Sequence, residues 1–475
     1  MKGNKNKKVQ VQEQQQTISI LQINLQNAID LFEEEKKIEN FIDQKLNEAN
    51  KNSEHLKVLK LYLENEMALN IQYFKKLPDI CLLENLQIKG FYTAEKQVKQ
   101  FFQFIERQTQ LKNLYIDVQC PYNEKKQFEA EFQNFCQRIG KFQKLEYLYL
   151  QIMSIESTNQ LKELSKSLKS LGSLKSLTLF FGQVGSEIVE LDSLAGYLET
   201  TKTLKTLQIK FEEPSTFPLK EAQQLFQAIG SNKSIEDLTL SFAGCTEFKK
   251  NLFQDLSNMI NNKKNLKKFS INFDSLSHIK ADEYTKVLKS IENMKALTSL
   301  EVNLNQNKTN IDQLTNLIKQ QTQLIHLELN LCDIKINGQF QKINDALKSF
   351  TKLKSLVLDL SNNKLFTKTF QGLFDFLPKL DLDHLSLDLS NEEGNYKEKF
   401  FFQIAKYIGQ CSSLKSLKFL LQYYDAEDDF YSQLIKELSK LQDLSTFIVS
   451  DALGEHLDNS VYKMFKSLVF FEMKY

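Results

Sequence analysis

The sequence predicts an α/β fold: a curved solenoid of about 16 repeats, with a parallel β-sheet on its concave face and helices on its convex face. Three observations support this prediction. An eight-residue apolar pattern recurs along the chain, its copies are spaced at about thirty residues, and segments with helical periodicity lie between the copies.

The repeated pattern is seen best at Leu353–Leu360, which reads LKSLVLDL. Counting Leu353 as position 1, apolar residues fall at positions 1, 4, 6 and 8. The last three alternate with other residues, as a strand with one buried face requires. Positions 3, 5 and 7 then point to the opposite face, so we expect them on the concave surface.

Copies of this octet recur in phase over most of the chain. In the central copies, position 4 is occupied by Leu177, Leu207, Leu238, Phe269, Leu300, Leu327, Leu356, Leu385 and Leu417. A spacing near thirty residues is typical of repeat architectures, in which one unit cannot bury its own apolar face and needs its neighbours.

The segments between octets predict helices. In Leu219–Ile229, the residues Ala222, Leu225, Phe226 and Ile229 follow i, i+3, i+4, i+7 spacing and form one apolar stripe that should face the strands. Each unit is therefore predicted to be strand, loop, helix, loop. Helices are wider than the roughly 4.8 Å between strands, so the helical side should form the longer, convex arc.

Four consecutive copies carry phenylalanine at position 8, namely Phe181, Phe211, Phe242 and Phe273. Residues at equal positions in stacked units should be neighbours, so we expect an inward aromatic column. A cofactor-binding box is the alternative, and core packing is the favoured interpretation.

This pattern resembles the leucine-rich repeat family, in particular its ribonuclease-inhibitor-like, long-repeat class. The resemblance rests on the octets and on the helix-to-strand junctions 194–204, 346–353 and 405–414. One departure concerns the asparagine that the family usually places just beyond the strand. That position holds Gly182, Glu212, Ala243, Asp274, Asn305, Cys332 and Ser361, so we expect looser turns without a regular asparagine ladder.

The predicted organisation is one solenoid domain over residues 18–475, preceded by a disordered basic, Gln-rich tail over residues 1–17. Residues 18–110 should form irregular N-terminal repeats, residues 111–443 regular repeats, and residues 444–475 the capping repeats. Proline is rare, at five residues, and no Gly/Ser/Pro-rich linker suggests a second domain.

The charge balance disfavours nucleic acid as a partner, because 61 basic and 60 acidic residues give a formal net charge of +1. Only Arg107 and Arg138 are arginines, so the chain has few side chains that can bind a phosphate through two parallel hydrogen bonds. The sequence shows neither a secretory signal nor a membrane span. The six scattered cysteines are expected as free thiols, which favours the cytoplasm, and the Lys2–Lys8 cluster leaves nuclear entry open.

No catalytic motif is recognisable, so the chain is predicted to be a non-enzyme without cofactor or metal. His326 and His384 both occupy position 3, but they lie two units apart, roughly 10 Å at the strand spacing. That separation is too large for a shared ion without further ligands. Solvated or partner-contacting roles are predicted for both.

Two groups on the concave face are candidate partner-binding residues. The first is an acidic and amide ladder at positions 5 and 7, comprising Glu301, Asn303, Glu328, Asn330, Asp359 and Asp388. Such a ladder could receive a basic segment of a partner, or it could be a polar face that discourages aggregation. The second is Tyr115, Tyr147 and Tyr149, which suit an interface or ordinary cross-strand packing.

These observations predict a non-enzymatic scaffold or adaptor that binds a protein on its concave face. The identity of the partner is not encoded in any recognisable feature. The resemblance implies an alternative, a regulator of a small GTPase, because some proteins with this repeat class activate GTP hydrolysis. A subunit of a ribonucleoprotein or chromatin assembly, binding through lysine-rich edges, is the third hypothesis.

Overall fold

The computed structural model describes residues 20–24, 44, 56–62, 83–92, 98–119, 125–152, 160–182, 190–212, 217–365, 370–391, 398–421, 434–450 and 470–474. It divides into two compact units, Met1–Ala228 and Ile229–Tyr475, which are considered separately below. The predicted tail over residues 1–17 lies outside the described residues.

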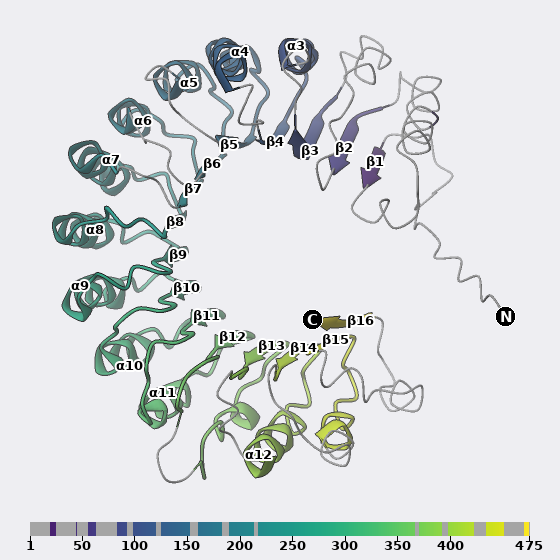
Figure 1. The fold of residues 1–475 in the computed structure, drawn as a ribbon, viewed down its shortest axis with the longest axis vertical. Helices are drawn as coiled ribbons and strands as arrows, with labels where there is room; N and C mark the ends of the chain where they lie inside the picture. The colour runs from purple at the N-terminus through teal and green to yellow at the C-terminus, as the bar shows by residue number, and fades with distance from the viewer. Residues whose placement is uncertain are drawn as a thin grey trace. The chain divides into compact units, whose positions relative to one another are not determined.

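The described residues of the first unit form seven strands, each parallel to the next in the chain (Figure 1). They are β1 Ile20–Asn24, β2 Val58–Tyr62, β3 Asn85–Tyr92, β4 Asn113–Gln119, β5 Tyr147–Ile152, β6 Ser176–Gly182 and β7 Thr206–Glu212. The helices lie on one side of the sheet. They are α3 Val98–Arg107, α4 Lys125–Arg138, the short η4 Ile139–Lys141, α5 Gln160–Leu168, α6 Leu191–Leu198 and α7 Leu219–Ser231, which ends in the second unit.

The second unit repeats this arrangement with nine strands (Figure 1). They are β8 Asp237–Ala243, β9 Lys268–Asn272, β10 Ser299–Asn303, β11 His326–Asn330, β12 Ser355–Asp359, β13 His384–Asp388, β14 Ser416–Leu420, β15 Thr446–Ser450 and β16 Phe470–Lys474. The helical elements include α8 Lys250–Asn262, α9 Ala281–Glu292, α10 Ile311–Gln320, α11 Phe340–Leu347, η5 Leu377–Lys379 and α12 Glu398–Ile408, and residues 434–438 are also helical. None of the helices in the described ranges combines the length and apolar character that a membrane crossing requires.

The predicted α/β repeat fold is confirmed. In the described residues all sixteen predicted strands are present, and most run from position 3 to position 7 of their octet. Adjacent strands pair position for position, for example Leu300 with Leu327 and Leu327 with Leu356. This register turns each octet position into a column of side chains that runs across neighbouring strands.

The core follows from that register. Leucines at positions 4 and 6, such as Leu356 and Leu358, are at most 1 % exposed. The phenylalanines at position 8 stack within each unit: the ring centroids of Phe181 and Phe211 are 5.2 Å apart, and those of Phe242 and Phe273 are 6.0 Å apart. These contacts confirm the predicted packing role.

The turns after the strands in the second unit are more regular than predicted. The residue at position 10 is left-handed in four successive repeats, namely Ser275, Gln306, Asp333 and Asn362, with φ between 51° and 59°. Its backbone N–H donates to the position 9 carbonyl of the next repeat, as from Gln306 to Cys332 at 2.9 Å. The expectation of loose turns is therefore wrong in this stretch, because backbone hydrogen bonds supply the regularity.

Buried asparagines reinforce these turns two residues beyond the position that the family resemblance suggested. The Asn307 amide donates to the carbonyls of Phe273 at 2.7 Å and Asn305 at 2.8 Å. Asn363 donates in the same way to Leu331 at 2.6 Å. Each amide crosses to the position 8 carbonyl of the preceding repeat, so these two residues link successive turns.

One repeat departs from the strand-and-helix plan. Between β12 and β13, the described residues 370–380 form turns and the short η5 in place of an α-helix. Gly372 and Phe374 have φ of 82° and 64°, which an α-helix cannot accommodate. Pro378 also disfavours helical backbone in the residue before it.

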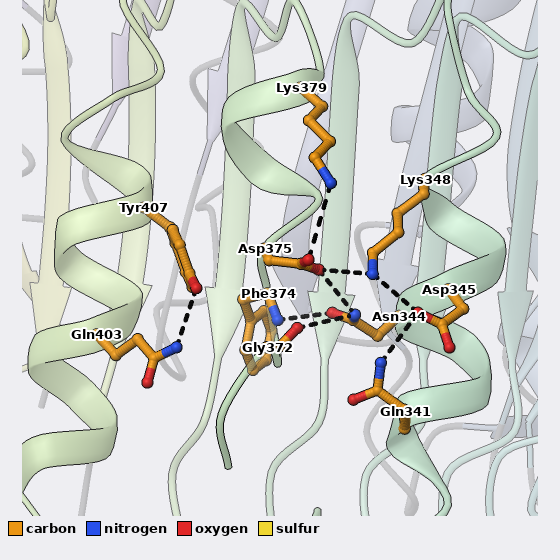
Figure 2. A network of polar contacts seen from close by, with 10 residues as sticks. All are labelled: Gln341, Asn344, Asp345, Lys348, Gly372, Phe374, Asp375, Lys379, Gln403 and Tyr407. Atoms are coloured by element: carbon orange, nitrogen blue, oxygen red, sulfur yellow. Dashed lines mark hydrogen bonds and ion pairs between the residues drawn. The ribbon is translucent and has the colours of Figure 1, made fainter.

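A polar network joins this irregular segment to α11 (Figure 2). The fully buried Asn344 donates from Nδ2 to the Gly372 carbonyl at 3.1 Å and to Asp375 Oδ1 at 3.0 Å. Its Oδ1 accepts from the Phe374 backbone N–H at 2.6 Å. Lys348 adds ion pairs of 2.9 Å to Asp345 and 3.0 Å to Asp375. The Asn344 amide thus hydrogen-bonds backbone groups of the irregular segment that have no α-helical hydrogen bonds.

A buried lysine makes a second polar connection in this unit. Lys263 is 0 % exposed, and its Nζ donates to the carbonyls of Asn232 at 2.5 Å and Ile235 at 3.1 Å. Burial, with a smaller contribution from the Lys233 charge, lowers the pKa of Lys263 to about 8. The ammonium is therefore still mostly charged at neutral pH, although burial disfavours its charged form.

We expect Asn344→Ala to lower the free energy of unfolding by about 1–3 kcal/mol, because it leaves the Phe374 N–H and the Gly372 carbonyl without partners. Urea titration followed by circular dichroism measures this change. Gln341→Ala is the matched control, since Gln341 is an exposed member of the same network and should change stability by less than about 0.5 kcal/mol. Equal effects of the two substitutions would contradict the role given to Asn344.

We expect Lys263 to make stability rise with pH. The folded state loses the proton near pH 8, whereas the unfolded chain keeps it to about 10.5, so the unfolded state binds more protons between these values. The free energy of unfolding of the native protein, minus that of Lys263→Met, should rise between pH 8 and 10 by on the order of 2 kcal/mol. The exposed neighbour Lys264, changed to Met, should give a flat difference over the same range.

Candidate functional site

The open face of the sheet in the second unit is the candidate site. In β10, β11 and β12 the burial alternates, so that positions 4 and 6 are buried and positions 3, 5 and 7 are half-exposed. The register places Glu301 opposite Glu328, and Asn303 opposite Asn330. Asp359 follows opposite Asn330, and Asp388 opposite Asp359. The predicted acidic and amide ladder is therefore present as two neighbouring columns.

The position 7 column has a structural use. Asn303 Oδ1 accepts the backbone N–H of Asn305 at 3.0 Å, Asp359 Oδ1 that of Ser361 at 3.0 Å, and Asp388 Oδ1 that of Ser390 at 2.9 Å. Each of these contacts is an Asx turn, in which the side-chain oxygen accepts the backbone N–H two residues later, a motif that Asn and Asp favour. These three predicted partner-binding residues thus help to end their own strands.

Asp388 is a half-buried member of that column. Burial raises the pKa of its carboxyl, while hydrogen bonds from Ser390 oppose the shift and the Asp359 carboxylate adds to it. The strand register therefore places the Asp359 carboxylate close enough to raise the pKa of Asp388.

The position 5 column is different, because its carboxylates are not used by turns. Glu301 on β10 lies opposite Glu328 on β11, and His326 precedes Glu328 by two residues on the same strand face. His326 Nε2 is 3.9 Å from Glu301 Oε1. One ligand atom from each of Glu301, His326 and Glu328 lies within 4.8 Å of the other two, so these residues could hold a metal ion. We call these three residues the Glu-His-Glu cluster.

Two neighbours orient the Glu-His-Glu cluster. The Oγ of Ser355 on β12 is 2.8 Å from His326 Nδ1. Asn330 Nδ2 donates to Glu328 Oε1 at 3.0 Å, which sets this ladder residue apart from the turn-closing Asn303. Within the described ranges, neither Glu301 nor Glu328 forms an ion pair with a lysine or arginine. The Glu301 charge also adds to the burial that raises the pKa of Asp237.

The tyrosine group lies on the open face of the first unit. Tyr115 and Tyr149 stack with ring centroids 3.9 Å apart and planes inclined by 15°. Tyr147 is 50 % exposed. Beside the stack, the Tyr149 hydroxyl donates to Gln151 Oε1 at 3.4 Å, and burial raises the pKa of the buried Asp117 carboxyl. Two of the three tyrosines thus contact each other across the strands, and their role in partner binding stays a prediction.

The lysines at position 2 are matched by acidic residues of the preceding repeat. Lys112 contacts Glu84 at 2.7 Å, and Lys175 contacts Glu146 at 2.7 Å. In the second unit, Lys267 contacts Glu236 at 2.5 Å and Lys415 contacts Asp383 at 2.8 Å. These exposed pairs contribute little stability, but they neutralise the edge that would otherwise attract phosphates.

The sequence analysis did not identify the acidic neighbours of His326. It compared His326 with His384, two strands away, whereas the structure brings Glu301 and Glu328 beside it. The signal was present: a His-x-Glu pair on one strand face, and a glutamate at position 5 of the preceding octet. The cluster becomes visible in the sequence when positions 3 and 5 of adjacent octets are compared with each other.

Comparison with known proteins adds little to this description. No family model matches the chain, and no curated protein matches it. Among the solved structures that match is a tropomodulin C-terminal domain from Caenorhabditis elegans, at 12 % identity, with 34 % of this chain and 93 % of that chain covered and a TM-score of 0.26. So distant a similarity carries no functional argument. The chain is accordingly described as an α/β repeat solenoid from its own strands, register and burial.

Proposed function

We propose that this protein is a non-enzymatic interaction scaffold whose open strand face in the second unit binds a basic segment of a protein partner. The observation that carries the proposal is the pair Glu301 and Glu328. These carboxylates stand opposite each other on the open face, and in the described residues no lysine or arginine pairs with them. Acidic groups left unpaired on a surface attract and orient a basic partner.

The same observation supports a protein over a nucleic acid. Glu301, Glu328 and Asp359 place negative charge where a phosphate backbone would be repelled. The position 2 lysines, which were the alternative contact for RNA or DNA, are paired with acidic residues. No observation favours the small-GTPase regulator, which remains an implication of the family resemblance alone.

Two further assignments belong to this proposal. A spacing near thirty residues, with a helix after most strands, supports the ribonuclease-inhibitor-like, long-repeat class. A cytoplasmic location is supported by the four described cysteines, Cys136, Cys245, Cys332 and Cys411, which are free thiols, three of them buried.

The test begins with affinity purification from source-cell extract, using the full chain and the double variant Glu301→Lys/Glu328→Lys. Partners recovered with the native protein and lost with the variant are then purified, and their affinity is measured at several salt concentrations. We expect the variant to bind at least about tenfold more weakly and with less salt dependence, because the attraction between unlike charges has become repulsion.

A matched control changes the same amount of charge on the helical side. Asp282 and Asp312 are exposed in the first turns of α9 and α10, so Asp282→Lys/Asp312→Lys should leave partner affinity unchanged. Asp359 is not altered, because it closes a turn and its loss would confuse binding with folding. Equal weakening by both double variants, or unchanged affinity of Glu301→Lys/Glu328→Lys, would contradict the proposal.

A further inference from the structure

We propose that the Glu-His-Glu cluster is a binding site for a divalent transition-metal ion, with zinc as the ion to test. The ligands would be His326 Nε2 and one carboxylate oxygen each from Glu301 and Glu328. This inference goes beyond the proposed docking function, because it concerns the isolated chain without a partner.

The distances between the ligand atoms support such a site. A tetrahedral zinc ion with nitrogen and oxygen ligands at about 2.0–2.2 Å holds its ligand atoms about 3.4 Å from one another. The three atoms here already lie within 4.8 Å of one another. The Glu301 side chain is 44 % exposed on the open face, so it is free to change rotamer. A movement of its carboxylate oxygen by about an ångström would bring the ligand atoms to the separation that zinc requires.

The neighbouring residues prepare these ligands. When His326 Nδ1 donates to Ser355 Oγ, at 2.8 Å, the lone pair is on Nε2, the nitrogen that faces Glu301. Asn330 holds the Glu328 carboxylate through a hydrogen bond of 3.0 Å. Metal-binding histidines and carboxylates are commonly oriented by hydrogen bonds of this kind.

The local charge also favours a cation. The Glu301 and Glu328 carboxylates lie opposite each other on adjacent strands and are close together. Among the described residues no lysine or arginine forms an ion pair with either glutamate, and the His326 imidazole lies 3.9 Å from the Glu301 carboxylate. A dication between the two carboxylates would therefore replace repulsion with attraction.

The chemistry of the ligands selects the class of ion. A neutral imidazole nitrogen suits zinc, copper, iron and nickel, whereas calcium and magnesium prefer oxygen ligands alone. Three protein ligands leave at least one coordination position for water or for an external ligand. An exposed site of this composition therefore fits a transition metal that is bound at the surface.

The experiment uses the full chain after chelator treatment, titrated with zinc chloride in an isothermal calorimeter. We expect one zinc ion per chain. His326→Gln, Glu301→Gln and Glu328→Gln should each weaken zinc binding by at least about tenfold. Ser355→Ala should weaken it less, through the orientation of His326. The control is His384→Gln, a histidine of the same column on β13, which should bind zinc as the native protein does.

Cobalt substitution distinguishes this site from a cysteine site. The bound cobalt should show ligand-field absorption without the strong thiolate charge-transfer band. Unchanged zinc affinity in His326→Gln, an equal loss in His384→Gln, displacement of zinc by an equal concentration of calcium, or a thiolate band would each overturn the proposal. Because His326→Gln keeps both carboxylates, partner binding measured in chelator separates failure of the metal site from failure of the docking surface.

Discussion

The in-register pairing of parallel strands is the constraint on which the other features depend. An octet exposes its leucines until a neighbouring repeat covers them, so each repeat is stable only within the stack. The pairing aligns position 4 with position 4 and position 5 with position 5 in adjacent strands. The neighbours of each side chain on the open face are consequently the residues at equal octet positions in the adjacent strands.

The columns divide structural and binding tasks between adjacent positions. Position 7 carries Asn and Asp because their side chains close the turn after the strand, as Asn303, Asp359 and Asp388 do. Position 5 carries no such duty, and there the glutamates remain available to solvent and to ligands. A substitution at position 7 should therefore change mainly the stability of the fold. A substitution at position 5 should change mainly the affinity for a ligand or partner.

Buried polar side chains secure the places where backbone hydrogen bonds are not sufficient. Asn307 and Asn363 bridge successive turns, Lys263 joins two carbonyls near the end of a helix, and Asn344 supports the repeat that lacks an α-helix. Each adds hydrogen bonds to buried backbone groups, and leaving such a group without any partner costs on the order of 1–3 kcal/mol. Variation in the length and shape of the repeats is thus compatible with in-register strand pairing from β9 to β13.

The sequence by itself determined the strands, their parallel order and the buried positions, because apolar alternation and a period near thirty are local features repeated many times. It also indicated Glu301, Glu328 and the ladder as polar residues of the open face. Only the tertiary structure decided which of them close turns, that Tyr115 and Tyr149 stack, and that the side chains of Glu301, His326 and Glu328 come together. These outcomes depend on side-chain orientation across strands that are distant in sequence. A pattern along one chain does not contain that information, because it specifies which residues share a column but not how their side chains are held.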